Sequence, residues 1–115
     1  MNRYRLTKAG INVNDGLRRF GGSQEIFERF LTKFPTNEVY SELLKALEAQ
    51  NVEAAFQAAH ALKGVAGNLS LEALYQALLP LVEELRTGSL TRVGELLPPV
   101  KDAYAAVIAV LTDNA

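Results

Sequence analysis

Apolar residues recur every three or four positions through most of the chain, and no segment alternates apolar and polar residues long enough to predict a strand. This pattern predicts an all-α protein. A short helix is expected over residues 15–20, and a pair of glycines ends it. A longer helix is expected from a Ser23 N-cap to about Phe34, where Pro35 stops it. Its predicted apolar stripe comprises Ile26, Phe27, Phe30, Leu31 and Phe34.

Two further helices follow Pro35. Thr36 or Asn37 is expected to cap the first, which runs to about residue 50. Asn51 is expected to start the second, which ends near residue 68 or 69. The residues that the first of these helices is expected to bury are Val39, Leu43, Leu44 and Leu47.

Ser70 is in a position to cap the next helix, expected over residues 71–86 and closed by Gly88. A last helical segment is expected over residues 90–111. The inward-facing residues of the 71–86 helix are expected to be Leu74, Leu78, Leu81, Val82 and Leu85.

Prolines fall inside both of these segments. Pro98 and Pro99 are expected to kink or split the last one, and Pro80 raises the same problem in the helix before it, because an internal proline removes an amide donor and clashes with the preceding turn. The connections are short, so neighbouring helices should pack antiparallel. The expected fold is an up-down antiparallel four-helix bundle with a short extra N-terminal helix, forming a single domain over residues 1–115.

Composition narrows the function. The chain has 115 residues, with 12 basic and 13 acidic side chains, so it lacks the basic excess that general nucleic-acid binding needs. It has no cysteine and one histidine, which excludes disulfides and the usual zinc ligand sets. No signal peptide and no apolar stretch long enough to span a bilayer is found, so a cytoplasmic location without a membrane segment is expected.

The single histidine, His60, is the candidate reactive residue. At about 100° per residue, Lys63, Gly64 and Gly67 fall within about 60° of it on the helix surface. Glycine in a helix costs about 0.8 to 1 kcal/mol relative to alanine, so two glycines on this face indicate clearance for something large. The residues on the opposite side are Ala58, Leu62, Val65 and Leu69.

The neighbours of His60 each have a functional and a plain structural interpretation. Lys63 is placed to offset the charge of a phosphoryl group on the imidazole, or is a solvated lysine. Gly64 and Gly67 make room for a partner, or allow close helix packing.

Two residues one turn earlier extend this face. Phe56 is expected to continue an apolar rim beside Ala59, or to lie at the edge of the bundle. Gln57 is placed to hydrogen-bond the imidazole, although an exposed glutamine needs no such role.

Some chemistry is missing from the sequence. No Asp or Glu lies within one turn of His60, and the chain has no P-loop, no glycine-rich nucleotide fingerprint and no HExxH. The sequence therefore offers no recognisable means of using ATP or a metal, and the chain is expected to accept and donate a group in a reaction catalysed elsewhere.

The segment His60-Ala61-Leu62-Lys63-Gly64, with residues 58–59 before it and 65–69 after it, resembles the signature of histidine-containing phosphotransfer (HPt) domains. Residues 11–17 and 20–23, followed by Phe27, Leu31 and Phe34, are similar to the usual entry into the first bundle helices of that family. The residue after the Asn-Leu pair is Ser70, where many family members have glycine.

This resemblance implies that His60 is phosphorylated by, and passes its phosphoryl group to, aspartates on receiver domains of response regulators or hybrid histidine kinases. It implies electrostatic support from Lys63 and room for the receiver at Gly64, with Phe56, Gln57 and Gly67 as further partner contacts. No cofactor is expected in this chain, because the receiver would supply Mg²⁺, and a monomer is the simplest expectation. The alternatives are a helical interaction domain that binds a receiver or kinase without carrying phosphate, an unrelated helical adaptor or self-associating bundle, and an enzyme with an unrecognised pocket.

Overall fold

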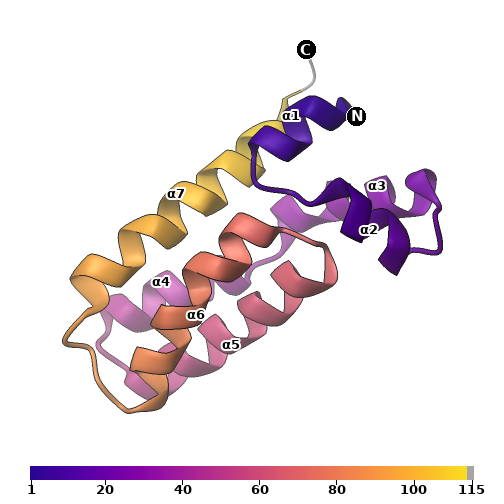
Figure 1. The fold of residues 1–115 in the computed structure, drawn as a ribbon. Coiled ribbons are helices and arrows are strands. Elements are labelled where there is room, and N and C mark those ends of the chain that lie inside the picture. Colours follow the sequence, from indigo (N-terminus) through magenta and orange to yellow (C-terminus); the bar gives the residue numbers. More distant parts are fainter. Residues whose placement is uncertain (114–115) are drawn as a thin grey trace.

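Helices account for all the regular structure in the computed structural model of the chain, which describes residues 1–113 (Figure 1). The all-α prediction is confirmed. No helix in this part of the chain is long and apolar enough to cross a membrane. The elements are α1 (Arg3–Lys8), α2 (Val13–Arg19), α3 (Gln24–Lys33), the 3-10 turn η1 (Phe34–Thr36), α4 (Val39–Glu48), α5 (Val52–Asn68), α6 (Glu72–Arg86) and α7 (Val93–Thr112).

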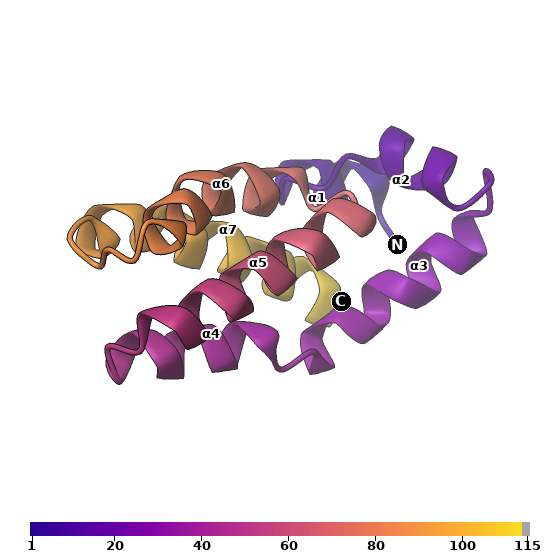
Figure 2. The ribbon, with the colours of Figure 1, turned by 90° about the horizontal axis from the view of Figure 1, so that it is seen from below.

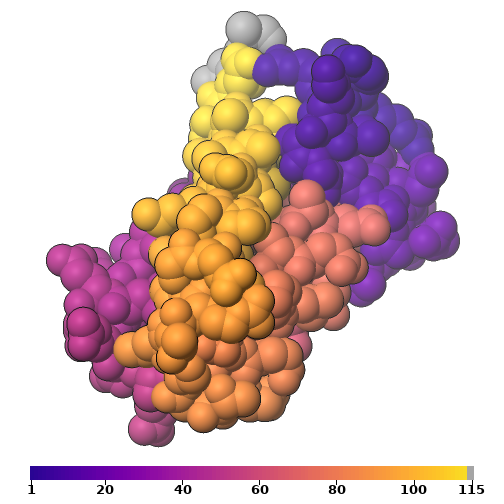
Figure 3. Space-filling view, turned by 60° about the vertical axis from the view of Figure 1, so that its left-hand side comes forward, coloured from indigo at the N-terminus to yellow at the C-terminus, as the bar shows by residue number. Residues whose placement is uncertain are grey.

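The main packed helix pairs follow one another along the chain: α4 packs on α5, α5 on α6 and α6 on α7. The 3-10 turn η1 separates α3 from α4, and α3 extends away from the N-terminal end of α4 (Figure 2). The short α1 contacts α2 and α7, and α2 contacts α3. These N-terminal elements lie beside the C-terminal part of α7 at one end of the molecule (Figure 3). This leaves α5 between α4 and α6, with its remaining side available to solvent.

Side-chain caps set most of the helix starts. The Ser23 hydroxyl accepts a hydrogen bond from the Ile26 amide, and the Asn51 side chain accepts one from the Ala54 amide, so both predicted caps are confirmed. Before α4 it is the Asn37 side chain that accepts, from the Val39 amide at 2.9 Å. The sequence prediction missed α1, which is also capped by an asparagine at its start.

Ser70 does not cap α6, and that prediction is wrong. Its backbone is left-handed, with φ of 58°, and its buried hydroxyl donates to Asp15 Oδ2 at 2.7 Å. Helix α6 instead begins after Leu71, with no side-chain cap. The Ser70 carbonyl accepts a hydrogen bond from the Asn12 amide at 2.8 Å, so this turn connects the start of α2 to the loop between α5 and α6.

The prolines do not split the last helix. Helix α6 runs through Pro80 and α7 runs through Pro98 and Pro99 without interruption. All three prolines are exposed, and the carbonyl groups that lose a partner, four residues earlier, belong to exposed residues that water can reach. Leu81 and Val100, which follow Pro80 and Pro99 in the chain, are fully buried and hold the helices to the core.

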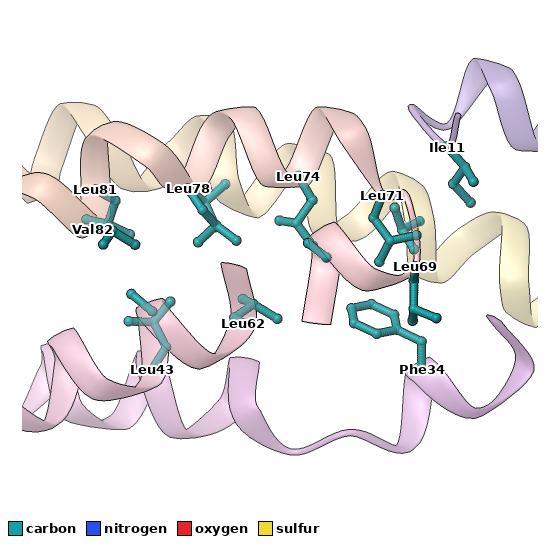
Figure 4. Close-up of a cluster of buried hydrophobic side chains, with 14 of the residues drawn as sticks. Ile11, Phe34, Leu43, Leu62, Leu69, Leu71, Leu74, Leu78, Leu81 and Val82 are labelled. Atoms are coloured by element: carbon teal, nitrogen blue, oxygen red, sulfur yellow. The ribbon is translucent and has the colours of Figure 1, made fainter. Parts of the chain in front are cut away.

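The core is a row of leucines and other apolar side chains between the helices (Figure 4). All five predicted inward residues of α6 are buried. Two residues of the predicted α3 stripe are not buried: Ile26 is 40% exposed and Phe30 is 45% exposed. Of the four residues predicted to be buried in α4, only Leu43 is fully buried. The short α3 and α4 therefore each present one narrow apolar edge to the core.

Candidate functional site

Helix α5 presents His60 on its exposed side. The opposite side is buried and consists largely of alanine, which lets the neighbouring helices approach closely. His60 therefore lies on the solvent-facing surface in the middle of α5, whose opposite side packs against α4 and α6. The buried residues are Ala55, Ala58, Ala59, Leu62 and Ala66.

An aromatic ring lies against the imidazole. The Phe56 and His60 ring centroids are 5.8 Å apart, with 24° between the ring planes. Phe56 is half-buried, so it is itself held in place. Ala59 has no exposed surface, so the prediction that it forms an apolar rim with Phe56 is wrong for Ala59.

Arg86, in the last turn of α6, lies over the same phenylalanine. Its guanidinium carbon is 5.1 Å from the Phe56 ring centroid, a cation–π distance. Its Nε also donates to Glu83 Oε1 at 3.2 Å. The sequence prediction missed Arg86, because it lies 26 positions after His60 and no periodicity within α5 points to it.

Lys63 lies one turn after His60 and is half-buried. Among the residues that the structure describes, no carboxylate forms an ion pair with its ammonium group. Its positive charge is thus available to a negatively charged group on this face.

The two glycines near His60 have different surroundings. A Cβ built on Gly64 has no atom within 4 Å, so this position opens onto solvent. A Cβ on Gly67 would lie 3.4 Å from a ring carbon of Tyr75 in α6, which is ordinary packing contact. Gly64 therefore leaves open space beside His60, whereas the space at Gly67 is partly filled.

Gln57 is exposed, one turn before His60. Within residues 1–113 its side chain makes no hydrogen bond with the imidazole. It contributes polar surface to this face of α5.

Two surface hollows flank the C-terminal half of α5. One, of about 310 Å³, is largely apolar and lies toward α3, with Phe20, Phe30 and Val65 among its lining residues. The other, of about 270 Å³, lies toward α2 and α6, with Asp15 and Tyr75 in its lining. The surface near the C-terminal end of α5 is therefore hollowed on both sides of the helix.

Asp15 in the second hollow is strongly hydrogen-bonded. Arg19 Nε donates to its Oδ2 at 2.8 Å, Ser70 donates at 2.7 Å, and Arg18 donates to Oδ1 at 3.0 Å. These bonds, with that from Arg19 the strongest, lower the pKa of Asp15 from 3.8 to about 2. Its negative charge is thus matched by the two arginines on its own helix.

This arrangement suits an exchange reaction with a large partner. The imidazole is exposed, Lys63 and Arg86 bring positive charge to its surroundings, and Gly64 leaves an approach open. Among residues 1–113, no group of three or more His, Cys, Asp or Glu side chains is placed to hold a metal ion. The residues described so far place an exposed imidazole on a surface that carries two cationic side chains.

The comparisons with known proteins found a match to a protein family. The family model described as Hpt domain matches residues 25–110, which include all of α5 and α6. No curated protein and no solved structure matches the chain.

Proposed function

The chain belongs to the Hpt domain family, and from this premise we propose that His60 carries the phosphoryl group. Hpt domains act in histidine phosphotransfer in phosphorelays, and they interact with receiver domains. The observation that carries the proposal is that the sole histidine of the chain is exposed within the matched segment, beside an open glycine. No other imidazole in the chain can take this role.

In the proposed reaction, His60 accepts a phosphoryl group from an aspartyl phosphate of a receiver domain. A lone pair of one imidazole nitrogen attacks phosphorus, the P–O bond breaks, and its electron pair leaves with the aspartate carboxylate. The second ring nitrogen keeps its proton, which exchanges with water because the ring is exposed. The reverse reaction passes the group to an aspartate of another receiver.

The surrounding residues support this exchange in distinct ways. Lys63 places positive charge beside the phosphoryl oxygens, and Gly64 leaves room for the receiver surface. Phe56, Gln57 and Gly67 extend the contact surface along α5. Mg²⁺ for the transfer belongs to the receiver, so this chain provides the nucleophile and the docking surface.

The fold gives the site its rigidity. We propose that α4 to α7 form an up-down antiparallel four-helix bundle and that residues 1–115 make a single domain. The support for this lies in the sequential packing of α4 on α5, α5 on α6 and α6 on α7 through short connections. A rigid α5 holds the nucleophile still for in-line attack.

The test follows label from a radiolabelled phospho-receiver onto the chain and onto its His60→Gln variant. We expect label on the wild type alone, at a site that is labile to acid and stable to base. His60 is exposed, so the variant should unfold at the wild-type temperature, and this is checked by circular dichroism. Equal labelling of a folded variant would refute the proposal, and no labelling by several receivers would favour a domain that binds receivers without carrying phosphate.

A further inference from the structure

Phe56 lies against His60, and Arg86 lies over Phe56. The transfer reaction proposed above gives Arg86 no role. The centroids of the imidazole and the Phe56 ring are 5.8 Å apart, and the Arg86 guanidinium carbon lies 5.1 Å from the Phe56 ring centroid. The two distances place this carbon at most about 11 Å from the imidazole centroid. An arginine side chain is long enough to close much of that gap by changing rotamer.

The surroundings of His60 differ on its two sides. Phe56 contacts Arg86 of α6, and Gly67 faces Tyr75 of α6, so this row of α5 faces α6. Lys63 lies on the same row, four residues before Gly67. Positive charge therefore gathers on the α6 side of the imidazole, whereas the open position at Gly64 lies on its other side.

Arg86 is held loosely enough to move. Its side chain is 49% exposed, and its ion-pair partner Glu83 is 67% exposed, so solvent weakens this pair. A phosphoryl group on His60 would carry close to two negative charges, and a guanidinium matches phosphate oxygens with two parallel donors. Pairing with phosphate would therefore compete well against the exposed Glu83.

We propose that Arg86 binds the phosphoryl group carried by His60, and that Phe56 holds the imidazole and the guanidinium on the same side of α5. This inference rests on the proposed function of His60. Arg86 turns from Glu83 to the phosphoryl oxygens when His60 is phosphorylated, and it acts together with Lys63. The receiver approaches over Gly64 while the two cations bind the oxygens that face α6.

The equilibrium of transfer tests this proposal, because a cation that binds the phosphorylated form shifts the balance toward this chain. The chain and a labelled phospho-receiver are mixed and the label on each is measured once the ratio is constant. We expect Arg86→Gln to lower the equilibrium constant about fivefold, as expected for the loss of one favourable exposed charge pair. Arg86→Lys should lose less, because it keeps the charge without the planar donors.

Arg5→Gln is the matched control. It removes the same charge from an exposed arginine that pairs with Asp113, near the end of α7. Its equilibrium constant should equal that of the wild type. A similar drop in Arg5→Gln and Arg86→Gln would mean that net charge alone is responsible, and would overturn the proposal.

A second measurement does not depend on transfer between proteins. In the nitrogen-15 NMR spectrum, the Arg86 Nε–H signal is identified by its absence in Arg86→Gln. Phosphorylation of His60 should shift this signal and leave that of Arg5 in place. A structural role for Arg86 would give no such shift.

The outcomes separate the two proposals. If the wild type takes label and Arg86→Gln reaches the same equilibrium, the role of Arg86 is refuted and the role of His60 stands. If the wild type takes no label, the proposed function fails and the inference fails with it. A lower equilibrium constant for Arg86→Gln alone, with the shifted Nε–H signal, supports the inference.

Discussion

Gly64 allows packing and docking to be separated by substitution. It lies in the middle of α5, and a Cβ built on it has no atom within 4 Å. A methyl group there would meet nothing in this chain. A loss of transfer on enlarging Gly64, in a variant that stays as stable as the wild type, is therefore expected to arise from contact with the partner.

The magnitude follows from helix propensity. Glycine inside a helix is about 1 kcal/mol less favourable than alanine, and no clash offsets that gain at Gly64. Gly64→Ala should therefore raise the free energy of unfolding by about 1 kcal/mol and the melting temperature by about 4 °C. Gly64→Leu should also be at least as stable as the wild type, yet it should block transfer from a receiver, because its side chain projects into the approach to His60.

The assay pairs thermal unfolding with the rate of label transfer for each variant. Gly94→Leu is the control, because a Cβ built on Gly94 also has no atom within 4 Å, and Gly94 belongs to α7, whose main packing partner is α6. Its transfer rate should be unchanged. A destabilised Gly64→Ala would show that this position is packed, and wild-type transfer by Gly64→Leu would refute the clearance argument.

Two further predictions concern the N-terminal elements. Gly16→Ala should destabilise the fold by about 1 to 3 kcal/mol in a denaturant titration, because the new Cβ would lie 2.2 Å from the Phe27 ring; an unchanged midpoint would contradict this packing. Asp15, with a pKa lowered to about 2, contributes stability that is fully present above its unfolded pKa of 3.8 and is lost as pH falls toward 2. Unfolding followed between pH 5 and 2 should therefore show a steeper acid loss for the wild type than for Asp15→Asn, and equal slopes would refute the role of the Arg19 and Ser70 hydrogen bonds.

Local signals in the sequence predicted the parts of the fold that local interactions control. Ser23 and Asn51 cap helices because their side chains bond amides three residues later, within the same segment. His60 is exposed because the spacing of apolar residues in α5 places the core behind it. The family match over residues 25–110 agrees with the resemblance that the His60 segment carries.

Contacts between distant segments determine the features that the sequence did not predict. Ser70 has the right chemistry for a cap, but its hydroxyl bonds Asp15, 55 positions away, and its left-handed backbone forms the turn that fastens α2. The same turn explains how serine occupies a position where the family often has glycine. Pro98 and Pro99 lie within a continuous α7 because neighbouring apolar residues are buried, and this burial depends on tertiary packing.

The residues of the site also divide into those that local spacing indicates and those that depend on tertiary packing. The sequence indicated Lys63 and Gly64 through their spacing from His60, since both lie on one helix. It did not indicate Arg86, whose position over Phe56 depends on how α6 packs on α5. Only the structure brings this second cation near the imidazole.

The most direct test of phosphoryl transfer observes the imidazole itself during phosphorylation. The chain has one histidine, so nitrogen-15 labelling of histidine gives signals from the two ring nitrogens of His60 alone. After incubation with a phospho-receiver, one of them should shift and couple to phosphorus-31. Phosphate incorporated while both ring nitrogen signals stay unchanged would place the modification on another residue and contradict the role of His60.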